Sequence, residues 1–89
     1  MSKENIKNKL INLLNKKMNF KKDILINENF DLPLTGKVFR LSSVDLVYLF
    51  FEVENLFNIK IDKSYLVDYQ FNSINSISII INKIHIDNM

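Results

Sequence analysis

The chain has 89 residues, of which 47% are hydrophobic and 25% charged, and its formal net charge is +2. This length suits one domain with a modest core and leaves no room for a separate catalytic domain, and the composition is that of an ordinary globular protein. With no Cys and one His, the chain offers no disulfide framework, no thiol nucleophile and no cluster with zinc-ligand spacing. We therefore expect no thiol chemistry and no metal site. We also expect a monomer that is not an enzyme.

No apolar run approaches the roughly 20 residues that a membrane-spanning helix needs. The first residues, Met1 to Asn5, lack the apolar core of a signal peptide. These features predict a cytoplasmic protein with no membrane partner.

Charge is divided unevenly along the chain. Residues 1–42 carry nine basic and four acidic side chains, a balance of +5, whereas residues 43–89 carry three basic and six acidic ones, a balance of −3. The lysines of the first segment are spread around a helix without the interleaved aromatic side chains of a nucleic-acid platform. A solvated face is therefore expected, and no nucleic-acid partner.

The first predicted helix covers about 3–18. Its apolar positions recur at helical spacing, Ser2 is a candidate N-cap, and Lys16 and Lys17 fall in the last turn, where cations oppose the helix dipole. The stripe consists of Ile6, Leu10, Leu13, Leu14 and Met18.

Residues 19–41 show no helical period and are expected to form a long loop, with a short helical turn near residues 22–26. This segment holds the only proline, Pro33, and the only glycine, Gly36. Its apolar residues should pin it to the core, and these are Phe20, Ile24, Ile26, Phe30, Leu32 and Phe39.

A second helix, over 43–57, is the best defined. Ser42 and Asp45 form an S-x-x-D capping box ahead of an apolar run, which makes Ser42 the N-cap. One buried stripe is predicted at Leu46, Leu49, Phe50, Val53 and Phe57. A second apolar strip either packs into the core or faces a partner, and both options remain open for its members Val44, Val47, Tyr48 and Phe51.

The last third of the chain predicts a short helix over 63–68 and a helix over 73–84. The final segment also alternates as strands do, and its β-branched isoleucines favour sheets, but no hairpin turn interrupts it and Ser73 or Asn72 can cap a helix. The helical stripe would be Ile74, Ile77, Ile81 and Ile84. His85 is expected past the end of this helix, without a catalytic role.

The middle of the chain reads Leu41-Ser42-Ser43-Val44-Asp45-Leu46, followed by Glu54-Asn55-Leu56-Phe57 and Ile61. These residues resemble the core of acyl carrier proteins. That family reads Asp-Ser-Leu, then an apolar helix, then Glu-x-x-Phe-x-x-x-Ile. Phe71-Asn72-Ser73-Ile74 resembles the opening of the last helix in peptidyl and stand-alone aminoacyl carriers. The likeness covers residues 2–84 in element order. Leu34-Thr35-Gly36 is also similar to acyl-carrier-related proteins of bacterial peptide maturation systems.

The resemblance implies an all-α, four-helix bundle of the acyl carrier type, with a long loop between helices 1 and 2 and a short helix 3. It implies that Ser43 carries a covalent 4'-phosphopantetheine arm, donated by coenzyme A, which makes the chain a phosphoprotein and thioester carrier in peptide maturation or secondary metabolism. The implied partners are a phosphopantetheinyl transferase, an acyl- or aminoacyl-loading enzyme and a downstream transferase. They would dock on Val44, Val47, Tyr48 and Phe51.

Two other functions fit the sequence. The chain has Ser42 where the family has Asp and Val44 where it has Leu, so the first alternative is an unmodified carrier fold that acts as an interaction module. The second is a small nucleic-acid-binding α+β domain that uses the basic first helix and isoleucine-rich strands.

Overall fold

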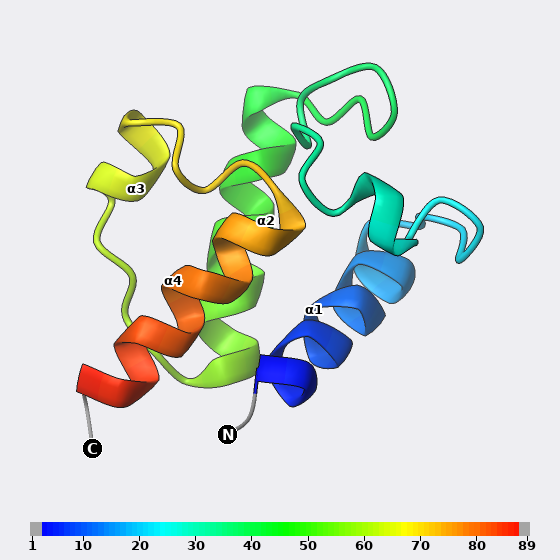
Figure 1. Ribbon diagram of the computed structural model, residues 1–89. Coiled ribbons are helices and arrows are strands. Elements are labelled where there is room, and N and C mark those ends of the chain that lie inside the picture. Colours follow the sequence, from blue (N-terminus) through cyan, green and yellow to red (C-terminus); the bar gives the residue numbers. More distant parts are fainter. Residues whose placement is uncertain (1–2, 88–89) are drawn as a thin grey trace.

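Helices make up the framework of residues 3–87, the part of the chain that this computed structural model describes. They are α1 (Lys3–Lys17), α2 (Ser43–Phe57), α3 (Ser64–Val67) and α4 (Ile74–Asp87), with one 3-10 turn, η1 (Asn27–Asn29) (Figure 1). No strand occurs in these residues, so the all-helical prediction is confirmed and the strand alternative for the last segment is wrong. The Cα radius of gyration is 12.1 Å, and about 12 Å is expected for one compact domain of this length.

Helix α1 packs along α4, and the two lie side by side in Figure 1. Ile6, Leu10 and Leu14 are fully buried, which confirms the predicted stripe. The helix ends at Lys17, one residue earlier than predicted, because Asn19 adopts a left-handed backbone conformation with φ of 61°. The proposed cap Ser2 lies outside the described residues.

Helix α2 spans the predicted residues 43–57 and buries every member of its predicted stripe. Its end is fixed locally, because Asn58 adopts φ of 54° and asparagine tolerates this left-handed conformation better than most residues. The side chain of Glu54 then accepts a hydrogen bond from the amide of Ile61 at 2.8 Å, which holds the chain as it leaves the helix.

Helix α3 is shorter than the predicted 63–68 and covers only Ser64–Val67. The segment that follows returns to the core through Phe71, which is fully buried and meets the ring of Phe50 edge-on, with 5.3 Å between ring centroids. This aromatic contact positions the start of α4.

Helix α4 is fixed at its start by two serines. The hydroxyl of Ser73 accepts a hydrogen bond from the amide of Ser76 at 3.0 Å, and the hydroxyl of Ser76 accepts one from the amide of Ser73 at 3.1 Å. The expected end near residue 84 is wrong, since the helix continues to Asp87 and includes His85. The ring of His85 packs against that of Phe57 on α2, with 6.4 Å between centroids, so a contact between helices supports the extra turn.

The segment between α1 and α2 lacks an α-helix and is held to the core, both as predicted. Its 3-10 turn lies just after the 22–26 region where a helical turn was expected. The amide of Leu34 donates to the carbonyl of Asn72 at 2.8 Å, and that of Asn75 donates to the carbonyl of Phe30 at 3.0 Å. Phe30 and Leu34 are buried, whereas Ile26 is exposed, contrary to its predicted anchoring role.

Candidate functional site

The start of α2 is built by a complete capping box. Ser42 has extended backbone angles, and its hydroxyl accepts a hydrogen bond from the amide of Asp45 at 3.1 Å. The carboxylate of Asp45 accepts a hydrogen bond from the amide of Ser42 at 3.0 Å. The prediction of Ser42 as the N-cap is therefore confirmed, and its hydroxyl is committed to the helix backbone.

Ser43 is the first residue of α2, and its side chain is exposed. Within residues 3–87 its hydroxyl has no hydrogen-bond partner, and neither have the amide N–H groups of Ser43 and Val44. These free N–H groups lie at the positive end of the helix dipole, where a phosphate group is favoured. The hydroxyl of Ser43 is thus accessible beside a backbone environment that suits a phosphodiester.

The chain just before this site is held in a tight conformation. The amide of Arg40 donates to the carbonyl of Gly36 at 2.8 Å, and that of Leu41 donates to the carbonyl of Leu34 at 2.9 Å. Arg40 has φ of 57°, a left-handed conformation that is uncommon for arginine, and its Nε donates to the carbonyl of Lys37 at 3.1 Å. These bonds fix the turn that leads into α2, and two cationic residues, Lys37 and Arg40, lie in it, six and three positions before Ser43.

The second apolar strip of α2 is exposed, which excludes the option that it packs into the core. The exposed fractions are 77% for Val44, 41% for Val47, 45% for Tyr48 and 49% for Phe51. A hydrogen bond from the Tyr48 hydroxyl to the carboxylate of Glu52 raises the pKa of that phenol. The strip begins beside Ser43 and forms an apolar surface that the core does not use.

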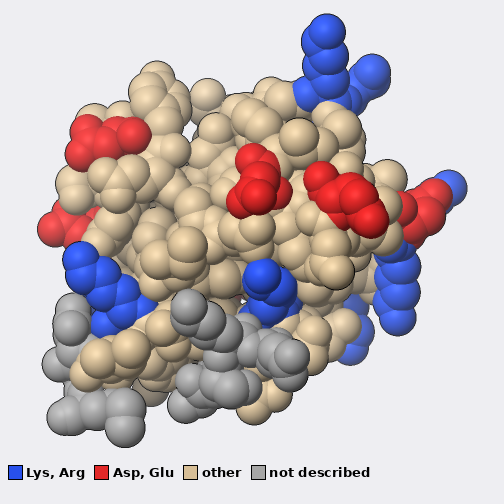
Figure 2. Space-filling view, viewed as in Figure 1, with Lys and Arg blue, Asp and Glu red and all other residues tan. Residues whose placement is uncertain are grey.

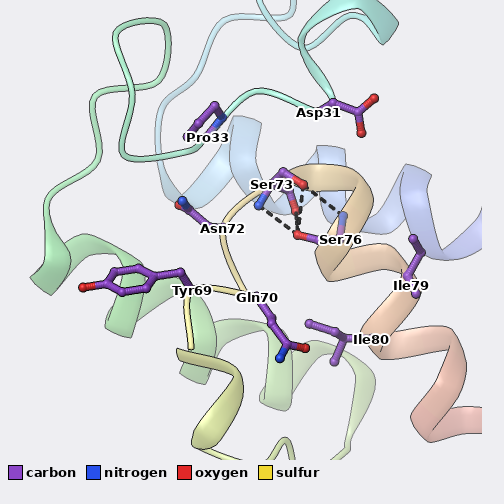
Figure 3. Close-up of a pocket in the computed structure, with 9 residues that line it drawn as sticks. All are labelled: Asp31, Pro33, Tyr69, Gln70, Asn72, Ser73, Ser76, Ile79 and Ile80. Atoms are coloured by element: carbon purple, nitrogen blue, oxygen red, sulfur yellow. Dashed lines mark hydrogen bonds between the residues drawn. The ribbon is translucent and has the colours of Figure 1, made fainter. Parts of the chain in front are cut away.

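The structure also contains a hollow that the sequence did not reveal. It has a volume of about 430 Å³ and lies where residues 31–33 and 69–73 meet the first turns of α4 (Figure 3). Ser73 and Ser76 form one wall, and Tyr69 and Ile79 stand at its edges. From the sequence Ser73 was predicted only as a possible helix cap, and no local pattern indicated a cavity. No residue of α2 lines this hollow, so it is separate from the Ser43 site.

Two further polar side chains, those of His85 and Asp62, have structural roles. His85 lies within α4 against Phe57, and Asp62 holds the start of α3 by accepting a hydrogen bond from the amide of Ser64 at 2.9 Å. This hydrogen bond lowers the pKa of Asp62. Among the described residues, no three His, Asp or Glu side chains come together as a metal-binding group. In the same part of the chain, no helix combines the length and apolar character needed to cross a membrane.

Comparison of the chain with protein-family models, curated proteins and solved structures gives no match. The likeness to acyl carrier proteins therefore depends on the residues quoted for it, above all those from Leu41 to Ile61.

Proposed function

We propose that the chain is a carrier protein that holds an acyl or aminoacyl group on a phosphopantetheine arm attached to Ser43. The observation that supports this most strongly is that the two adjacent serines at the start of α2 have hydroxyls in different environments. Ser42 caps the helix, while the hydroxyl of Ser43 is exposed and has no partner among the described residues. A serine that only capped the helix would have its hydroxyl on the backbone, as Ser42 has.

The residues around Ser43 fit a phosphodiester. The free amides of Ser43 and Val44 offer donors to phosphate oxygens, and the positive end of the α2 dipole favours the negative charge. The bound arm would supply the terminal thiol that forms the thioester. The chain has no cysteine and therefore no thiol of its own. The chain itself has to display the serine, hold the phosphate and present a surface to partner enzymes.

The apolar strip Val44, Val47, Tyr48 and Phe51 is the proposed docking surface for those enzymes. Its exposed area adjoins Ser43 along the same helix, so an enzyme seated on it would reach the attached arm. The proposed partners are a phosphopantetheinyl transferase, a loading enzyme and a downstream transferase of peptide maturation or secondary metabolism.

The test is modification of the purified chain. Incubation with a broad-specificity phosphopantetheinyl transferase and coenzyme A should add the mass of one phosphopantetheine group. Ser43→Ala should abolish this gain in mass. Ser42→Ala should retain it, because loss of the capping hydroxyl weakens the helix but leaves the Ser43 hydroxyl to accept the phosphopantetheine group. An unchanged mass of the wild-type chain would contradict the proposal.

A second candidate function is an interaction module that keeps the carrier fold without modification. It is favoured by Ser42 at the position where carriers have Asp, and by Lys37 and Arg40 upstream, since modifying enzymes read an acidic surface in that family. The exposed strip would then bind a partner directly. In that case Ser43→Ala would leave partner binding intact, whereas Val47→Glu would remove it.

The structure does not support the alternative of a nucleic-acid-binding α+β domain. It required isoleucine-rich strands, and residues 74–87 form a helix instead. On the face drawn in Figure 2, basic and acidic side chains are interspersed among uncharged ones and do not form a continuous basic surface. A phosphate-binding track needs clustered cations, so this face does not supply one.

A further inference from the structure

A second apolar feature lies between α1 and the C-terminal end of α2. It is a groove of about 290 Å³ whose apolar lining comes from Leu13 on α1 and Leu56 on α2. Leu13 is recessed, with 7% of its surface exposed, whereas Leu56 keeps 42%. Leu56 belongs neither to the buried stripe of α2 nor to the strip beside Ser43, so neither core packing nor the proposed carrier function explains its exposure.

The border of this groove is cationic. Lys9, Lys16 and Lys17 line it together with Asn12, and all four side chains are exposed. Among the residues whose side chains the structure describes, no carboxylate lines the groove, and these three lysines form no ion pair. These three charges are therefore unpaired within the described part of the chain.

We propose that this groove binds an acidic amphipathic helix of a partner protein. One apolar side chain of that helix would cover Leu13 and Leu56, and carboxylates on either side of it would pair with the lysines. Helix-in-groove recognition uses this combination of apolar anchors and complementary charge. A membrane surface fits less well, because insertion requires protruding apolar side chains, whereas Leu13 lies at the bottom of a hollow.

This inference goes beyond the proposed carrier function and does not depend on it. Leu56 lies 13 residues after Ser43 on the same helix, which separates them by about 20 Å along its axis. A partner in the groove would leave Ser43 and the neighbouring strip free. The Ser43→Ala protein is consequently a suitable background for the test, since it removes any contribution from modification.

The probe is a synthetic helical peptide in which leucines recur every three or four residues between glutamates. We expect its titration into isotopically labelled Ser43→Ala protein to shift amide resonances of α1 from Lys9 to Lys17 and of the last turn of α2. The triple substitution Lys9→Gln, Lys16→Gln and Lys17→Gln should weaken binding at least about tenfold, because it removes every cation lining the groove. Replacing the glutamates of the peptide by glutamine should have a comparable effect.

The matched control is the triple substitution Lys21→Gln, Lys22→Gln and Lys83→Gln, which removes the same charge from exposed lysines outside the groove. It should weaken binding less than about twofold. Equal weakening by the two triple variants, shifts centred elsewhere, or no binding of the peptide would overturn the proposal. Vesicles containing phosphatidylglycerol are the second probe, and lysine-dependent binding to them without peptide binding would overturn it in favour of a membrane surface.

Discussion

Ser42 and Ser43 are adjacent, yet α2 places their hydroxyls in different environments. The Ser42 hydroxyl accepts a hydrogen bond from the helix backbone, and that of Ser43 is exposed. Ser42→Ala should therefore cost about 1 kcal/mol of folding free energy, and Ser42→Asp should be neutral or stabilising because Asp caps as well as Ser. Denaturant melts would measure both. A destabilising Asp would show that the capping role of Ser42 is misassigned.

Asp62 gives a prediction about pH. Its carboxylate accepts a hydrogen bond from the amide of Ser64 at the start of α3, which lowers its pKa in the folded protein. A group with a depressed folded-state pKa stabilises the folded state above its unfolded pKa, and this contribution is lost as pH falls through the folded value. NMR titration of the Asp62 carboxyl should give a midpoint below that of a free aspartate. A midpoint at or above the free value would contradict this hydrogen bond.

Helix α2 carries two apolar surfaces with opposite predicted responses to substitution. Val47 is exposed, so Val47→Glu should change the free energy of unfolding by no more than about 0.5 kcal/mol. Phe57 is buried, and Phe57→Ala should cost about 3 to 5 kcal/mol, enough to unfold a domain of marginal stability. Denaturant melts of the two variants would compare these costs.

Val47→Glu, which should hardly affect stability, should strongly affect loading of the carrier by a partner enzyme. Val47→Glu should stay folded but fail to be loaded, because a charge desolvated at an apolar interface without a paired group is costly. If Val47→Glu melts as poorly as Phe57→Ala, the strip is core and the proposed docking surface is wrong.

The limits of sequence-based prediction are visible at the level of elements. The boundaries of α2 were predictable because its start depends on the local pair Ser42 and Asp45 and its stripe repeats at helical spacing. The end of α4 was not, because the extra turn is supported by the contact between His85 and Phe57, which no local pattern encodes. For the same reason the exposure of the Val47 strip remained open until the packing of α2 was known.

At the scale of the whole molecule, the segment between α1 and α2 was least predictable. It has no hydrophobic period, and its path is determined by hydrogen bonds to distant backbone, such as those from Leu34 to Asn72 and from Asn75 to Phe30. The sequence predicted a long loop pinned by its apolar residues, and the structure adds the backbone hydrogen bonds that attach this loop to the start of α4. The hollow at the start of α4 and the groove beside Leu56 also depend on such tertiary packing, which explains why neither was predicted.

The overall composition of secondary structure gives a simple test of the fold. Circular dichroism of the purified chain should show a predominantly helical spectrum, because residues 3–87 hold four α-helices and no strand. A strand-rich spectrum would contradict the helical architecture and, with it, the placement of Ser43 at a helix start.

The central claim, that Ser43 carries the arm, is tested most directly by locating the modification. The wild-type chain should be coexpressed with a broad-specificity phosphopantetheinyl transferase, digested and sequenced by tandem mass spectrometry. The account predicts one phosphopantetheine group on the peptide that contains Ser42 and Ser43, with fragment ions that assign it to Ser43. Attachment at Ser42 or any other residue, or a fully unmodified peptide, would contradict it.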